Sequence, residues 1–201
     1  MSVQTEHGSG AGTRRERRKR EVHDRIVEAA TTLFERQGFS ATTALEIAEA
    51  ADVAEKTFYN HFPTKQHLME ELARGSLTRL LGVLAEARAA GTLRERLERF
   101  FEGAAADAAE SSRPLARELI LEWIRISQVE HTGDRRLHDG FAALFAGTGD
   151  AREHEFLADM AVATYTGILI NWVSRSGYPL RERLLAAARL LSSALPKKES
   201  R

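Results

Sequence analysis

The chain has no cysteine and only four prolines in 201 residues. Without cysteine it can form no disulfide, and it offers no thiolate for catalysis or metal binding. No apolar run approaches the roughly 20 residues that a membrane-spanning helix needs, and the N-terminus lacks the apolar segment of a secretory signal. These absences predict a soluble protein of the cytoplasm.

The chain also has no net charge, because 29 basic side chains balance 29 acidic ones. Nucleic-acid-binding domains are usually basic, so the total alone argues against that function. The local distribution favours it, because a short N-terminal run is almost entirely basic: Arg14, Arg15, Arg17, Arg18, Lys19 and Arg20. Two interpretations stay open, a solvated helix start and an arm that contacts DNA phosphates or enters a minor groove.

No stretch of strand length alternates apolar and polar residues. Apolar residues instead recur at the three- and four-residue spacing of helices, which predicts an all-α fold with about nine helices. The first amphipathic helix starts near Val22 and ends at Gly38. Glycine there, followed by the apolar Phe39, predicts a Schellman ending.

The stretch from Thr42 to Phe62 predicts two short helices joined by a tight turn. Thr43 and Glu46 have the spacing of a capping box at the start of the first helix. Asp52 tolerates a left-handed backbone and therefore suits the turn. In the second helix Phe58 and Phe62 share one face, which leaves the other side chains free to point away from the core.

These residues resemble the helix-turn-helix of TetR-family transcriptional regulators. The resemblance rests on Thr42-Thr43, Ile47-Ala48, Ala51-Asp52-Val53, Thr57-Phe58-Tyr59, His61-Phe62 and Lys65. Two positions depart from the usual family pattern. Asp52 replaces a turn glycine, and Leu45 stands where a basic or polar residue often helps to hold DNA.

The resemblance implies DNA-binding roles for residues of this stretch. Thr43, Tyr59, His61 and Lys65 are implied to face phosphates, and Glu55, Lys56, Thr57 and Asn60 to enter the major groove. The side-chain chemistry is suitable, because Lys can donate to guanine, Asn can pair with adenine, and Glu can accept from cytosine. Packing remains an alternative for Tyr59, as does helix capping for His61.

The last two helices, about 151–176 and 180–195, are apolar around much of their circumference. So much apolar surface exceeds what one small domain can cover, which predicts a C2 homodimer with a four-helix interface. The interface residues expected from this pattern are Phe156, Met160, Gly167, Ile170, Leu184, Ala188 and Leu191.

By analogy with the family, the C-terminal part binds a small effector. Aromatic and aliphatic side chains there are expected to line an apolar cavity, although aromatics at helical spacing are equally typical of core. The expected lining is Phe100, Leu119, Trp123, Phe141, Phe145 and Tyr165. The charged residues of the helix after Pro114, including Glu118 and Glu122, are interpreted as a solvated face.

Two other classes of protein fit the sequence less well. An all-α enzyme has little support, because there is no glycine-rich phosphate loop or G-x-S-x-G elbow, and His131, His138 and His154 lack the spacing of a known metal motif. A dimeric protein-interaction module would leave the capped helix-turn-helix unexplained. We therefore expect no catalysis, no cofactor and no metal.

The sequence thus predicts a homodimeric, ligand-responsive transcriptional repressor with a palindromic DNA operator as partner. A regulator without an effector is the alternative. The expected ligand is a small apolar or amphipathic molecule, and no membrane is involved. The expected domains are a disordered N-terminus with a basic arm (1–20), a DNA-binding domain (21–66, helix-turn-helix about 43–62), a ligand-binding and dimerisation domain (67–196) and a tail (197–201).

Overall fold

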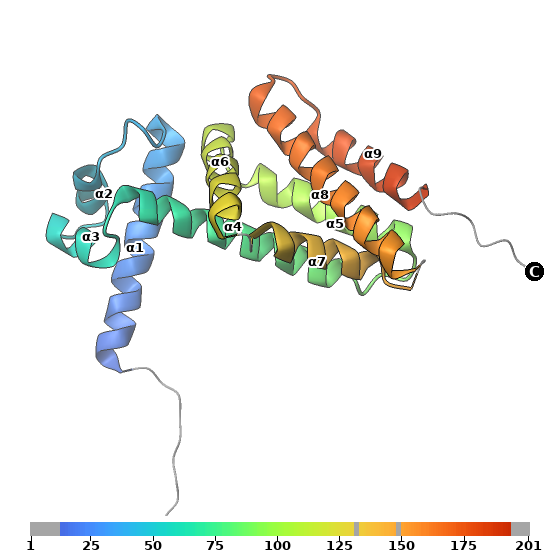
Figure 1. Cartoon of the computed structure of the whole chain (residues 1–201). Coiled ribbons are helices and arrows are strands. Elements are labelled where there is room, and N and C mark those ends of the chain that lie inside the picture. Colours follow the sequence, from blue (N-terminus) through green and yellow to red (C-terminus); the bar gives the residue numbers. More distant parts are fainter. Residues whose placement is uncertain (1–12, 131–132, 148–149, 194–201) are drawn as a thin grey trace, which may run out of the picture. The chain divides into compact units, whose positions relative to one another are not determined.

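The computed structural model describes residues 13–130, 133–147 and 150–193. All regular secondary structure in these ranges is helical, in nine helices (Figure 1). The predicted all-α fold is confirmed. The chain divides into two compact units, of which unit 1 ends at Lys65 and unit 2 starts at Gln66. The tail at 197–201 and the part of the predicted disordered segment before residue 13 lie outside the described residues.

Unit 1 contains α1 (Arg14–Gln37), α2 (Ala44–Ala50) and α3 (Glu55–His61). One small core holds them together, because each helix contributes side chains that are almost fully buried. These are Ile26, Ala30, Leu33 and Phe34 of α1, Ile47 and Ala48 of α2, and Phe58 of α3. Burial of this apolar surface is what fixes two helices that are too short to be stable alone.

The basic run from Arg14 to Arg20 forms the first two turns of α1. The predicted arm is therefore helical, and the helix starts before the predicted boundary at 21. A capping box explains the early start, since the Thr13 backbone N–H donates to Glu16 Oε2 at 2.7 Å and the Glu16 N–H donates to Thr13 Oγ1 at 3.3 Å. These bonds satisfy two of the backbone donors that a helix start leaves unpaired.

The end of α1 differs in detail from the predicted Schellman motif. Gly38 has φ 82° and ψ 161°, which lies outside the left-handed helical region and in a region that is essentially confined to glycine. Its N–H still donates to the Phe34 carbonyl at 2.9 Å. Phe39 folds back as expected, and its ring lies 5.3 Å from the ring of Phe34.

Unit 2 contains the remaining helices. They are α4 (Lys65–Ala87), α5 (Leu93–Ala109), α6 (Arg113–Glu130), α7 (Gly133–Phe145), α8 (Ala151–Ser174) and α9 (Leu180–Ser193). The first residue of α4, Lys65, belongs to unit 1. Helix α5 packs on α9 and α7, and α8 packs on α9, α7 and α6. In Figure 1, α8 and α9 (orange and red) lie side by side as a hairpin.

An aromatic cluster forms the centre of unit 2. Phe100, Phe101 and Phe141 are fully buried, and the rings of Phe100 and Phe141 meet edge to face at 4.8 Å. Two helices approach α4 at glycines, since a Cβ on Gly103 or Gly140 would lie 2.6 Å from the nearest side-chain carbon of α4. The core is therefore packed too closely for larger residues at these two positions.

Glu122 of α6 is buried, with 6% of its surface exposed, which corrects the prediction of a solvated residue. Its carboxylate accepts from Gln66 Nε2 at 2.6 Å and from Arg125 Nη2 at 2.6 Å. Arg125 also pairs with Glu70. A buried carboxylate requires such partners, and this network joins α6 to the first turns of α4.

Helix α8 is long and apolar enough, by length and composition alone, to cross a membrane. An 18-residue window within Arg152–Ser174 has a mean hydropathy of 1.3, although only 28% of it is buried within the single chain. The sequence predicted no membrane-spanning helix in this stretch. Its exposed residues follow one face, as described below, rather than the whole circumference.

Candidate nucleic-acid interface and effector pocket

The first helix of the helix-turn-helix, α2, begins with the predicted capping box. The Thr43 N–H donates to Glu46 Oε2 at 2.7 Å, and the Glu46 N–H donates to Thr43 Oγ1 at 3.2 Å. Thr43 Oγ1 also donates to the Glu46 carboxylate. These hydrogen bonds hold the pKa of Glu46 below its ordinary value. Thr43 is exposed but already serves this cap, and Leu45, in the first turn of α2, is exposed without offering a polar group.

The turn after α2 is a Schellman motif centred on Asp52. Asp52 has φ 53°, as the sequence predicts, and its N–H donates to the Glu49 carbonyl at 3.1 Å. The Val53 N–H donates to the Ala48 carbonyl at 2.9 Å. This pair of bonds defines the motif and fixes the angle at which the chain enters α3.

Helix α3 has one buried face and one exposed face. Phe58 and Phe62 are buried, and their rings lie 6.0 Å apart. On the other side, Tyr59 exposes 46% of its surface although its ring edge contacts Phe58. The remaining residues expected to meet bases are Glu55, Lys56 and Asn60, which are exposed, and Thr57, which is partly exposed. Helix α3 therefore presents a polar surface of the kind that reads the major groove.

The start of α1 and the end of α3 line one groove in unit 1. Arg15, Arg18 and Lys19 of α1 face the same space as Thr57, Asn60 and His61 of α3. Arg14 and Arg17 are exposed, and Arg17 lies 3.8 Å from Glu21 in an ion pair. The groove thus combines cations, which suit phosphates, with amide and hydroxyl groups. Lys19 belongs to the predicted basic arm, but sequence spacing alone did not show that it lies beside α3.

His61 ends α3 and contacts α1 through aromatic rings. Its ring centroid lies 5.9 Å from that of His23, and the His23 ring lies 5.0 Å from that of Phe62. Partial burial lowers the pKa of the His61 imidazole, and the nearby His23 and Lys19 lower it further. A phosphate in the groove would act in the opposite direction and favour the imidazolium.

We expect His61 to make the stability of the free protein depend on pH. Because its folded pKa lies below 6.5, the unfolded chain binds the proton more readily, and the free energy of unfolding falls as the pH drops below 6.5. Urea unfolding of the wild type and of His61→Gln, from pH 7.5 to about pH 5, tests this. The wild type should lose stability relative to the variant on acidification, and a constant difference between the two would contradict the assignment.

Lys65 has a different role from the predicted phosphate contact. Its Nζ donates to the carbonyls of Phe39 and Thr42, both at 2.6 Å, and lies 4.3 Å from the centre of the Phe39 ring. Partial burial lowers the pKa of its ammonium group, and Glu46 acts against this shift. Lys65 therefore holds the loop between α1 and α2, and most of its hydrogen-bonding capacity is used within unit 1.

Replacing Lys65 by methionine is expected to destabilise the protein by about 2 to 3 kcal/mol, because two charge-assisted hydrogen bonds are lost. Lys56→Met removes the same group from an exposed site on α3 and should change stability by less than about 0.5 kcal/mol. Chemical unfolding of both variants measures the difference. Equal stabilities of the two variants would contradict this structural role and favour Lys65 as a phosphate contact.

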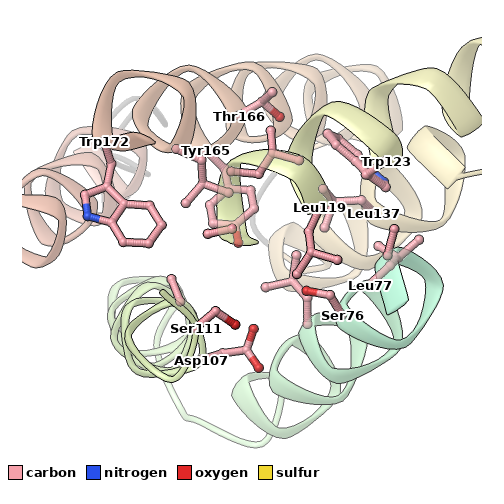
Figure 2. Close-up of a pocket in the computed structure, with 16 residues that line it drawn as sticks. Ser76, Leu77, Asp107, Ser111, Leu119, Trp123, Leu137, Tyr165, Thr166 and Trp172 are labelled. Carbon is pink, nitrogen blue, oxygen red and sulfur yellow. The ribbon is translucent and has the colours of Figure 1, made fainter. Parts of the chain in front are cut away.

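Unit 2 contains a cavity between α4, the end of α5, α6, α7 and α8 (Figure 2). The cavity has a volume of about 80 Å³. Leu119, Trp123 and Tyr165 line it, whereas Phe100, Phe141 and Phe145 are fully buried in the neighbouring core and do not. The latter three were wrongly placed, because helical spacing alone cannot distinguish core from cavity wall. Lining residues that the sequence did not single out include Ser76, Leu77, Asp107, Ser111, Leu137 and Thr166.

The residues expected at a dimer interface fall into two groups. Phe156, Met160 and Ile170 are exposed on α8, and Gly167 between them is partly exposed. Leu184, Ala188 and Leu191 of α9 are instead buried in the core of the same chain, which corrects their assignment. Their face of α9 is covered within unit 2, where α9 packs on α5. Leu190 points the other way and is 68% exposed.

Metal binding finds no support in the part of the chain that the structure describes, which contains no cluster of three or more His, Asp or Glu residues suited to an ion. His138 lies 3.4 Å from both Asp139 and Asp159, and His131 is outside the described residues.

A capped helix-turn-helix with an exposed polar second helix, followed by a separate helical unit with a cavity, defines a DNA-binding regulator of the helix-turn-helix class. Residues 26–72 match the family described as "Bacterial regulatory proteins, tetR family". The chain is 28% identical to the HTH-type transcriptional repressor KstR of Mycolicibacterium smegmatis, over 95% of this chain and 94% of that protein. The chain therefore has the DNA-binding domain of TetR-family transcriptional regulators, as its motifs predict.

Solved structures show the same fold. FadR of Thermus thermophilus, a TetR-family repressor in complex with lauroyl-CoA, matches with a TM-score of 0.61 and 26% identity, over 88% of this chain and 96% of that one. SmeT, the repressor of the Stenotrophomonas maltophilia multidrug efflux pump SmeDEF, matches with a TM-score of 0.69 over 89% of this chain and 93% of that one. Its identity is 18%, so this second likeness concerns the fold alone.

Proposed function

We propose that the protein is a homodimeric repressor, which binds a palindromic operator and leaves it when a small apolar or amphipathic molecule occupies the cavity of unit 2. The observation that carries the DNA-binding part is the groove of unit 1, where Arg15, Arg18 and Lys19 face the same space as Asn60. The cations supply affinity for any DNA, and the polar side chains of α3 select the sequence.

Cations in the first turns of a helix are unfavourable for folding, because the helix dipole places partial positive charge there. The basic run of α1 therefore contributes little to stability. An anionic partner offsets this repulsion, and the phosphates of DNA are such a partner. A DNA-contacting role for the basic run is therefore favoured over that of a solvated helix start.

The dimer that we propose forms through a single face of α8. Phe156, Met160, Ala163, Gly167 and Ile170 recur at the spacing of one helical face, and all five are exposed or partly exposed. The small residues Ala163 and Gly167 allow a second helix to approach closely. Leu190 is a further exposed apolar residue, on α9, and a contact that includes both helices of the α8–α9 hairpin would join four helices from two copies. This role also accounts for the apolar composition of α8 without a membrane.

Repression and effector binding are proposed from both the relatives and the cavity. KstR is named a repressor, and FadR, also a repressor, was solved with a bound ligand. The cavity of unit 2 supplies a largely apolar site between helices, as small-molecule sites in helical domains usually do. We therefore assign the protein to regulation in the cytoplasm rather than to catalysis. A regulator without an effector is the second candidate.

Selection of bound fragments from a random DNA library tests the proposal. A twofold dimer predicts an inverted repeat whose half-sites lie about 34–36 Å apart or a multiple of that distance. Recovery of a single asymmetric half-site would contradict a dimer with two DNA-reading units. Failure to recover any sequence above background would contradict the operator itself.

A further inference from the structure

The cavity of unit 2 has one polar corner in an otherwise apolar wall. Figure 2 shows the side-chain oxygens of Asp107 and Ser111, at the end of α5, and of Ser76, on α4, directed toward the same part of the cavity. The ring of Tyr165, on α8, lies above them. Leu77, Leu119 and Leu137 form the apolar wall beside this corner.

Asp107 is the one charged residue among those that line the cavity in the described structure. Its Oδ1 accepts a hydrogen bond from Arg79 Nε at 2.8 Å, and the Arg79 side chain is half exposed and does not line the cavity. A carboxylate only accepts hydrogen bonds and has more than one acceptor site per oxygen, so this pair leaves Asp107 able to accept from a ligand. Burial, and after it the charge of Asp107, raise the pKa of the Tyr165 hydroxyl, which stays protonated.

Other polar atoms near the cavity are not open to it. Trp123 Nε1 and Thr166 Oγ1 have no hydrogen-bond partner in the described structure, yet both atoms are buried from solvent. Neither atom is accessible to a ligand in this structure, whereas the oxygens of the polar corner face the cavity.

We propose that Asp107 selects the polar end of the effector, so that the cavity takes an apolar molecule ending in a hydrogen-bond donor, a hydroxyl or an ammonium group, and discriminates against a carboxylate. This inference depends on the proposed effector function. A donor satisfies the Asp107 carboxylate, whereas an anion at the same place meets a like charge at a partly buried site. Arg79 reduces the net charge of the corner, which favours the neutral hydroxyl over the ammonium.

Intrinsic tryptophan fluorescence reports on this site directly, because the chain has two tryptophans and both Trp123 and Trp172 line the cavity. The full chain is titrated with four eight-carbon probes, namely 1-octanol, octylamine, octanoate and methyl octanoate. We expect 1-octanol to bind at least about tenfold more tightly than octanoate, a difference of roughly 1.4 kcal/mol, and more tightly than the methyl ester, which cannot donate. Tighter binding of octylamine than of octanoate would also support the proposal.

Two variants test whether Asp107 and Arg79 cause this difference in affinity between the probes. Asp107→Asn removes the charge but keeps an acceptor for Arg79, and should raise the affinity for octanoate about tenfold relative to 1-octanol. Arg79→Gln leaves the Asp107 charge unpaired and should strengthen octylamine relative to 1-octanol. Octanoate or methyl octanoate binding as tightly as 1-octanol, unchanged in Asp107→Asn, would overturn the donor preference while leaving an apolar effector site intact. No fluorescence response to any of the four probes would overturn both the preference and the effector cavity.

Discussion

Replacing Met160 and Ile170 of α8 together with glutamate is expected to convert the protein from a dimer to a monomer at micromolar concentration. Both side chains are exposed in the single chain, so the change should not disturb its own core. In a twofold interface, however, the substitution places four carboxylates in a surface that must lose its water. Sedimentation velocity measures the loss directly.

The same double variant should bind the operator about 10²- to 10⁴-fold more weakly, because two linked DNA-reading units become one. Leu121→Glu on α6 is the control, since Leu121 is a comparably exposed apolar residue, at 48%, on a different helix. It should leave both the dimer and operator binding unchanged. A double variant that sediments like the wild type would show that the α8 face is not the interface.

Replacing Arg15, Arg18 and Lys19 with alanine is expected to abolish binding to all DNA at physiological salt. Each lost phosphate contact lowers the slope of log affinity against log salt by about 0.9, so six contacts per dimer lower it by about 5. Stability should stay the same or rise, because these cations oppose the dipole of α1. Fluorescence anisotropy with operator and unrelated duplexes, over a range of salt concentrations, measures the effect.

A variant with Arg88, Arg94 and Arg99 replaced by alanine controls for net charge, because it loses the same three charges from exposed positions in unit 2. We expect it to keep nearly the whole salt slope. If both triple variants lost the same slope, DNA binding would reflect the overall charge of the chain rather than the groove of unit 1.

The sequence predicted those elements whose signals are local. The capping box at Thr43, the left-handed Asp52 and the Phe58–Phe62 face of α3 all depend on residues within four positions of each other. In such cases the hydrogen bonds or the buried face can be inferred from spacing alone. The exposure of Phe156, Met160 and Ile170 on α8 also agrees with the sequence, which predicted these residues at an interface.

Roles that depend on tertiary neighbours were less predictable. Lys65 caps carbonyls that lie more than twenty residues earlier, and Glu122 is buried by partners on α4. Neither contact leaves a periodic signal in the sequence. Phe100 and Tyr165 are likewise both aromatic residues at helical spacing, yet Phe100 lies in the core and Tyr165 lines the cavity. The polar corner around Asp107 was not predicted, because a lone carboxylate among alanines resembles an ordinary solvent-facing residue.

The most direct test of the account is the base preference of Asn60→Ala on the selected operator. Binding of the wild type and of the variant is measured on the operator, on operators with each base pair of the half-site changed in turn, and on unrelated DNA. The exposed amide on α3 predicts a loss of about 1 to 3 kcal/mol that is confined to one base pair of each half-site, with unrelated DNA bound as before. A variant with the same base preferences as the wild type, or one weakened equally on every duplex, would contradict the assignment of α3 as the helix that reads DNA.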